Sequence, residues 1–199
     1  MEQYPSILGS AKAPLNKPCI AFYKYDGSNL RFEWSPKQGW NKYGTRRQLF
    51  DERTPIFGKA IQLFNDTMGD EIIRRVKEHV RNPQRITAFA EFFGPGSFAG
   101  SHIETETQEL RLFDVFLFKR GLLPVKDFVN LFGELPYTAE IVYEGLLNKK
   151  FINDVKIGEY KVFEGVIAKG SDFMIKIKTD EYFQRLRNKY PERWEEFGE

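Results

Sequence analysis

Charged residues inside apolar, strand-like runs constrain the fold of this chain more than any other feature. Three carboxylates, Glu91, Asp114 and Glu164, lie within such runs or at the start of one. Lys176 and Lys178 lie two residues apart in a further run, which places both on one face of a strand. Burial of an unpaired charge costs on the order of several kcal/mol. The fold is therefore expected to bring opposite charges together in a shared polar site.

The segment 24–29, with the sequence Lys-Tyr-Asp-Gly-Ser-Asn, lies between two other apolar runs. A partly desolvated lysine at a strand end, flanked by cations, has a lowered pKa because its charged form is disfavoured. Its free amine is then a nucleophile near neutral pH. The same segment is also compatible with a strand–turn–strand hairpin that carries a solvated Lys24.

The other charged residues also have ordinary structural explanations when each is taken alone. Glu91 and Asp114 are compatible with strand-edge or salt-bridged carboxylates, and Phe113 between such runs is compatible with a core side chain. Lys176 and Lys178 are compatible with the wet face of a half-buried strand. The order and spacing of all the segments together are harder to explain in this way.

The composition indicates one globular domain, residues 1–199, with 41% hydrophobic and 29% charged residues. The net charge of +2 does not by itself indicate a nucleic-acid-binding protein, although a local basic face is compatible with it. Cys19 is the only cysteine, which excludes an intrachain disulfide and a cysteine-based zinc site and makes the reducing cytoplasm the expected location. The only histidines, His79 and His102, argue against a histidine-rich metal site. No apolar run approaches membrane-spanning length, so no membrane partner is expected.

The hydrophobic periodicity predicts strands that come mostly in neighbouring pairs, which favours an α+β fold built around antiparallel sheet. The expected strands are 18–25, 28–34, 86–93, 110–118, 139–143, 162–169 and 173–178, and the expected helices are 58–66, 70–80, 124–132 and 181–188. Residues 1–17 are expected to be irregular and 40–55 a polar, basic stretch, with a short helix and turn within 144–159. Strands 18–25 and 28–34 are expected to pair with each other, and Thr179 or Asp180 to cap the last helix.

Six segments, in this order, resemble the motifs of the covalent nucleotidyltransferase superfamily, which comprises ATP-dependent RNA ligases, DNA ligases and mRNA capping enzymes. The segments are Lys24-Tyr25-Asp26-Gly27, Thr45-Arg46, Glu91-Phe92-Phe93-Gly94, Phe113-Asp114-Val115, Glu164-Gly165-Val166 and Lys176-Ile177-Lys178. The resemblance is closest to RNA ligases of the nick-sealing type. It implies antiparallel sheets flanked by helices in the nucleotidyltransferase (ATP-grasp-like ligase adenylation) fold.

The resemblance also implies a role for each residue. Lys24 would form lysyl-AMP from ATP. Glu91 would bind the ribose, and Phe113 with its neighbour Asp114 would contact the purine. Glu164 would bind Mg²⁺ (or Mn²⁺) near the reacting phosphate, and Lys176 and Lys178 would contact the α-phosphate. Tyr23, Asn29 and Arg46 are further expected nucleotide contacts. Arg46, Arg47 and Lys42 are expected to contact the phosphates of RNA ends or of a nicked duplex.

The chain departs from the family pattern after Lys178, where residues 179–199 have no room for an OB-fold or a helical C-terminal domain. Either a minimal ligase or a core that needs a partner protein or domain is therefore expected. A DNA ligase, a GTP-dependent capping guanylyltransferase and a catalytically silent nucleotide- or end-binding module remain alternatives to an RNA ligase.

Overall fold

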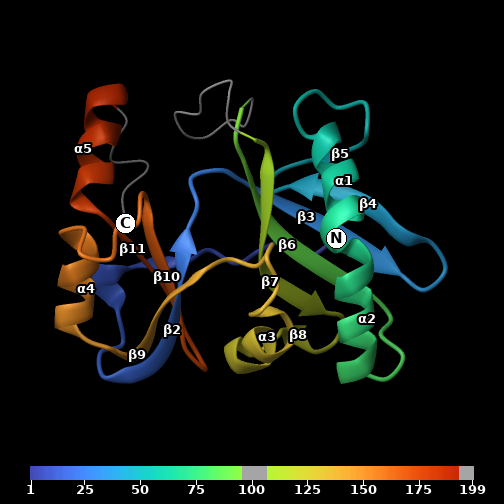
Figure 1. The fold of residues 1–199 in the computed structure, drawn as a ribbon, viewed down its shortest axis with the longest axis horizontal. Coiled ribbons are helices and arrows are strands. Elements are labelled where there is room, and N and C mark those ends of the chain that lie inside the picture. The colour runs from blue at the N-terminus through green and yellow to red at the C-terminus, as the bar shows by residue number, and fades with distance from the viewer. Residues whose placement is uncertain (96–106, 193–199) are drawn as a thin grey trace. The chain divides into compact units, whose positions relative to one another are not determined.

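The computed structural model describes residues 1–95 and 107–192 and has a mixed α+β fold (Figure 1). The strands are β1 (Leu8–Gly9), β2 (Lys17–Lys24), β3 (Ser28–Ser35), β4 (Gly39–Thr45), β5 (Leu49–Phe50), β6 (Ile86–Phe93), β7 (Glu109–Leu117), β8 (Gly121–Leu122), β9 (Ile141–Leu147), β10 (Gly165–Lys169) and β11 (Met174–Lys178). The α-helices are α1 (Gly58–Phe64), α2 (Asp70–His79), α3 (Val125–Phe132), α4 (Lys149–Lys156) and α5 (Asp180–Lys189). The expected α+β class is confirmed. No helix within these described ranges is long and apolar enough to cross a membrane.

The chain divides into two compact units. Unit 1 comprises Met1–Tyr4 and Asp26–Ala139, and unit 2 comprises Pro5–Tyr25 and Glu140–Glu199. The segment that follows Lys24 therefore leads from unit 2 into unit 1. That the two units act as one adenylation domain stays a prediction.

The sheet of unit 2 has the strand order β1-β11-β10-β2-β9. β1 pairs with β11 in parallel, and the other neighbouring strands pair antiparallel. β10 lies between β2 and β11, so that segments far apart in the sequence become neighbours. As a result, the start of β10 lies between the end of β2 at Lys24 and the end of β11 at Lys178.

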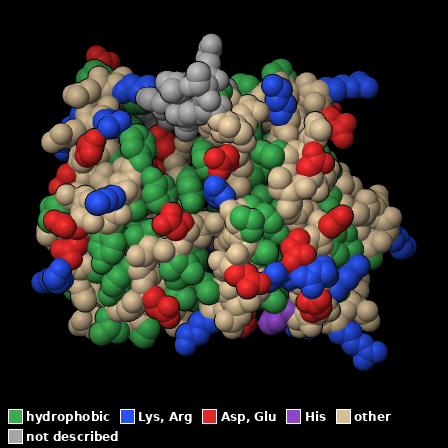
Figure 2. Space-filling model, viewed as in Figure 1, with side chains coloured by type: hydrophobic (Ala, Val, Ile, Leu, Met, Phe, Trp, Pro, Cys, Tyr) green, Lys and Arg blue, Asp and Glu red, His purple; other side chains and the backbone are tan. Residues whose placement is uncertain are grey.

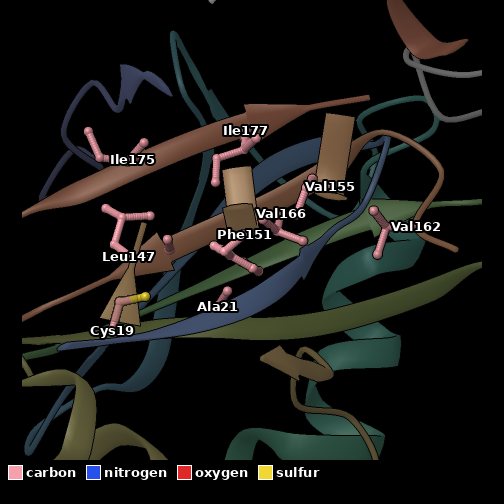
Figure 3. Packing of buried hydrophobic residues seen from close by; sticks show 10 residues of the cluster. Cys19, Ala21, Leu147, Phe151, Val155, Val162, Val166, Ile175 and Ile177 are labelled. Atoms are coloured by element: carbon pink, nitrogen blue, oxygen red, sulfur yellow. The ribbon is translucent and has the colours of Figure 1, made fainter. Parts of the chain in front are cut away.

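One face of this sheet packs on an apolar core, shown in Figure 3. The core consists of Cys19, Ala21, Leu147, Phe151, Val155, Val162, Val166, Ala168, Ile175 and Ile177. Phe151 and Val155 lie four residues apart on one side of α4, which begins at the cap residue Asn148. Since successive side chains of a strand point to opposite faces, Lys24 of β2 and both lysines of β11 lie on the face away from this core.

The sheet of unit 1 has the strand order β5-β4-β3-β6-β7-β8 and is antiparallel throughout. α1, a π-helical turn (Asn65–Gly69) and α2 follow one another along the chain. Phe64 of α1 stacks on Phe32 of β3 with 3.9 Å between ring centroids. The buried residues Ile72 and Val76 of α2 extend the same apolar side, as the helical periodicity predicted.

The expected pairing of strands 18–25 and 28–34 is wrong, although both strands are present as β2 and β3. β2 pairs with β9 and β10, whereas β3 pairs with β4 and β6. A Cβ atom at Gly27 would lie 2.5 Å from the carbonyl oxygen of Phe92, so the chain enters unit 1 close against β6 instead of turning back on β2. Two stretches expected to be irregular or polar also contain strands: β1 lies within 1–17, and most of β4 and all of β5 lie within 40–55.

Gly165, at the start of β10, is expected to tolerate no side chain. Its φ is +150°, and a Cβ atom would lie 2.0 Å from the carbonyl oxygen of Ile177. We expect Gly165→Ala to lower the free energy of unfolding by about 3 kcal/mol or more, because backbone strain and steric overlap add. Equilibrium unfolding in urea measures this loss.

The matched control is Gly39→Ala in the β3–β4 turn. Gly39 has a φ of +65°, and nothing lies within 4 Å of the position that an added methyl group would take, so only the backbone strain of about 1 kcal/mol is expected. Equal losses in the two variants would contradict the steric explanation for Gly165.

Candidate active site

Lys24, Gly165 and Lys178 form one row across three adjacent strands of unit 2. Lys24 on β2 is the register partner of Gly165 on β10, and Gly165 is the register partner of Lys178 on β11. Lys176, two residues earlier on β11, lies on the same face of the sheet. Because the central position of the row carries no side chain, the lysines on either side of it reach the same space.

Glu164 lies between these lysines, directly before the glycine of the row. Its Oε1 is 2.6 Å from Nζ of Lys24 and 3.4 Å from Nζ of Lys178. The side chains of Glu164 and Lys178 are 5% and 8% exposed, whereas that of Lys24 is 24% exposed. The structure thus brings together three of the residues selected from the sequence, and the most accessible of them is the expected nucleophile.

The burial of Lys178 has an electrostatic consequence. Removal of this ammonium from water lowers its pKa below the usual value for lysine; the carboxylate of Glu164 acts in the opposite direction, and the positive charges of Lys24 and Lys176 lower the pKa further. The cluster of Lys24, Lys176, Lys178 and Glu164 therefore holds more positive charge than its one carboxylate balances. Such a surplus favours the binding of an anionic group such as a phosphate.

Two aromatic rings of α5, which no sequence motif indicated, cover Lys178. Its Nζ lies 5.1 Å from the ring centroid of Tyr182 and 5.9 Å from that of Phe183. Cation–π attraction of this kind stabilises a buried ammonium. The only signal in the sequence was the placement of these aromatic residues in the first turn of a helix that follows Lys178 directly.

Tyr23 lies on the other face of β2 from Lys24. Its ring packs against the core of unit 2, and its hydroxyl oxygen accepts a hydrogen bond of 3.0 Å from the backbone N–H of Phe163. Tyr23 therefore supports the segment that precedes Glu164. A one-residue step along a strand reverses the direction of a side chain, which explains why neighbours in the same motif have different surroundings.

In unit 1, Asn29 and Glu91 are register partners on β3 and β6. Oδ1 of Asn29 is buried and has no hydrogen-bond partner within the described residues. A buried acceptor without a partner is costly in a folded protein, so this atom is suited to a donor from a ligand, such as a sugar hydroxyl.

Phe113 is the extra residue of a β-bulge, since the partner of Phe89 on β7 is Asp114 and the partner of Ala90 is Leu112. Asp114 is buried and accepts a hydrogen bond of 2.8 Å from the hydroxyl of Tyr4. The ring of Tyr4 meets that of Phe113 edge-on, with 5.0 Å between centroids. Asp114 thus anchors the bulge that presents the half-buried Phe113.

The expected phosphate contacts of unit 1 differ in their surroundings. Arg46 and Arg47 are exposed in the turn after β4, which is held by hydrogen bonds from the N–H groups of Arg47 and Gln48 to Oγ1 of Thr45. Lys42 is half-exposed and lies 3.3 Å from the buried carboxylate of Glu33. On the face drawn in Figure 2, Lys and Arg side chains are interspersed with Asp and Glu.

His102 lies outside the described residues. Within the described ranges, no three or more His, Cys, Asp and Glu side chains gather into a group that could hold a metal ion.

Comparisons with known proteins show which solved structures have a similar fold. No family model matches the sequence, and no curated protein matches it. A solved RNA ligase from Naegleria gruberi, with pyrophosphate (PPi), superposes with a TM-score of 0.68 at 16% identity and covers 94% of this chain and 58% of that chain. A mutant of the same ligase with AMP and Mn gives a TM-score of 0.69 at 14% identity, over 93% and 58% of the two chains.

An archaeal ATP-dependent RNA ligase is similar to the same degree, with a TM-score of 0.68 at 16% identity over 94% of this chain and 51% of that one. At such low identity the likeness shows the fold, and the expected nucleotidyltransferase fold is confirmed. The chain spans 51% to 58% of the length of these ligases.

We expect Glu164→Gln to lower the free energy of unfolding by about 3–5 kcal/mol, because it leaves buried Lys178 without its anion. Addition of Lys178→Met should recover part of this loss by removal of the unpaired charge. Urea unfolding of the single and double variants measures both effects.

Asp172→Asn is the matched control, since it breaks the exposed pair between Lys17 and Asp172, and it should leave stability unchanged within error. A Glu164→Gln variant as stable as this control would contradict the description of the cluster as a buried ion pair.

Proposed function

We propose that this chain is an ATP-dependent RNA ligase that joins a 3′-hydroxyl to a 5′-phosphate through a lysyl-AMP intermediate. The observation that carries the proposal is the oxygen of Glu164 that Lys24 and Lys178 share, at 2.6 and 3.4 Å. The order of the six sequence segments and the likeness in fold to ATP-dependent RNA ligases support it.

In the first step, Nζ of Lys24 attacks the α-phosphorus of ATP. The N–P bond forms, the bond from phosphorus to the bridging oxygen breaks, and pyrophosphate leaves. The attack requires Nζ to lose a proton, and Oε1 of Glu164, at 2.6 Å, is the acceptor that the geometry offers. Lys176 and Lys178 supply positive charge where the phosphate oxygens become more negative.

A divalent metal ion fits the donor set of this cluster. Mg²⁺ commonly binds one or two carboxylates and fills its remaining positions with water and phosphate oxygens. Glu164 offers one carboxylate, and a larger protein cage is lacking in the ranges described. An ion held by Glu164 and the triphosphate would neutralise phosphate charge, and Mg²⁺ or Mn²⁺ is the proposed cofactor.

The nucleoside of ATP is proposed to bind the residues that the family motifs select. Glu91 and Asn29 offer oxygen acceptors from adjacent strands, which suits the ribose hydroxyls. Phe113, presented by its bulge, is the proposed purine contact, and Asp114 supports that bulge through Tyr4. Arg46 is the proposed contact at the boundary between nucleotide and RNA.

The second and third steps transfer and release AMP. An oxygen of an RNA 5′-phosphate attacks the phosphorus of lysyl-AMP, the N–P bond breaks, and Lys24 regains its amine. A 3′-hydroxyl then attacks the activated 5′-phosphate, a phosphodiester forms, and AMP leaves. Arg47 and the partly paired Lys42 are the proposed contacts to the RNA backbone, which carries no sequence information.

We expect wild-type protein incubated with Mg²⁺ and α-labelled ATP to retain label on a denaturing gel, because the phosphoramidate is covalent. Lys24→Ala should abolish the labelled band, and Lys17→Ala, on the same strand but exposed, should retain it. Label from GTP alone would indicate a capping enzyme. Nucleotide binding without label would indicate a silent module, and sealing of nicked DNA but not nicked RNA would indicate a DNA ligase.

Arg47→Ala should weaken binding to a nicked RNA duplex and lower the slope of log K against log salt by about 0.7–0.9, as expected for one lost phosphate contact. Formation of lysyl-AMP should not change, because that step involves no RNA. Arg120→Ala, an exposed arginine in the β7–β8 turn, is the control and should leave the salt slope unchanged. Equal slopes in wild type and Arg47→Ala would remove Arg47 from the proposed interface.

A further inference from the structure

Thr179, between β11 and α5, holds the backbone on both sides of the Glu164 peptide. Its N–H donates to the carbonyl oxygen of Glu164 at 3.0 Å, and its hydroxyl donates to the carbonyl oxygen of Phe163 at 3.0 Å. The same hydroxyl oxygen accepts from the N–H of Tyr182 at 3.1 Å and so caps α5. The side chain is almost completely buried. One small residue therefore joins the start of the helix to the segment that carries the catalytic carboxylate.

Tyr182, in the first turn of α5, contacts both Lys178 and Phe163, the residue before Glu164. Its ring lies 5.1 Å from Nζ of Lys178 and meets the ring of Phe163 edge-on, with 5.8 Å between centroids. Arg185, in the next turn, places its guanidinium 4.8 Å from the ring centroid of Phe163. The helix thus contacts the residue before Glu164 and the ammonium that shares its oxygen.

These contacts converge on a geometry that the sheet alone does not determine. Strand pairing fixes the backbone of Gly165 against Lys24 and Lys178, but Glu164 lies just before β10 begins. Its backbone carbonyl accepts from Thr179, and the N–H of the preceding Phe163 donates to the hydroxyl oxygen of Tyr23. A shift of about 1 Å in a reacting group is enough to slow a reaction by two orders of magnitude.

We propose that Thr179 and Tyr182 are positioning residues, which hold Glu164 and Lys178 in the arrangement that the attack of Lys24 on ATP requires. This inference rests on the proposed function. The two roles are separable. The hydroxyl of Thr179 holds the backbone that carries the carboxylate of Glu164, and the face of the Tyr182 ring holds the ammonium of Lys178. Neither side chain needs to touch ATP.

The test measures single-turnover formation of lysyl-AMP in the full chain, over a range of ATP concentrations. Thr179→Val, which keeps the shape but loses the hydroxyl, and Tyr182→Leu, which loses the ring, should each lower the maximal rate at least tenfold. The conservative variants Thr179→Ser and Tyr182→Phe keep the hydroxyl and the ring and should stay within about threefold of wild type.

Asn148→Ala is the matched control, since Asn148 caps α4 in the same unit by accepting from Phe151 N–H at 2.8 Å. It should lose stability to urea as Thr179→Val does but keep the wild-type rate. A wild-type rate in Thr179→Val and Tyr182→Leu, or an equal loss of rate in Asn148→Ala, would overturn this inference alone. Absence of label on the wild-type protein would overturn the proposed function and this inference with it.

Discussion

The carboxylate that Lys24 and Lys178 share is the interaction on which the site depends. Lysines in one row of a sheet repel each other, and Lys178 is buried, so the arrangement is stable only with the anion of Glu164 at 2.6 and 3.4 Å. Apolar side chains of similar volume would often be as stable at such positions. The presence of the charged cluster is therefore better explained by the chemistry it allows than by stability.

This interaction in turn explains features of the fold in unit 2. β10 has to lie between β2 and β11 for the lysines to approach from both sides, and its first residue has to be glycine because Ile177 leaves no room for a Cβ atom. Glu164, just outside the strand, then depends on α5 for its position. A short sheet, one helix and one threonine hydroxyl surround Lys24, Glu164 and Lys178, while the apolar core lies on the opposite face of the sheet.

Periodicity was sufficient to predict most strands. The cost of buried charge predicted one shared site for Glu91, Asp114, Glu164 and the lysines; Glu164 does lie against Lys24 and Lys178, whereas Asp114 accepts a hydrogen bond from Tyr4. The pairing of β2 with β10 was not predictable from local sequence, because its partner lies about 140 residues away in the chain and only the folded sheet selects it. Likewise, Thr179 or Asp180 was predicted as the helix cap, and Thr179 takes this place, but its bond to Phe163 depends on the tertiary structure. The ion pair between Lys42 and Glu33 joins register partners of β3 and β4, and it was not predicted because residues 40–55 were expected to be a polar stretch without a strand.

The most direct measurement of the central claim is peptide mapping by mass spectrometry after incubation of the protein with ATP and Mg²⁺. We expect one peptide to gain the mass of AMP, the modification to lie on Lys24, and the bond to be labile in acid as a phosphoramidate is. An AMP group on any other residue, or unmodified Lys24 in protein that has released pyrophosphate, would contradict the assignment of Lys24 as the nucleophile.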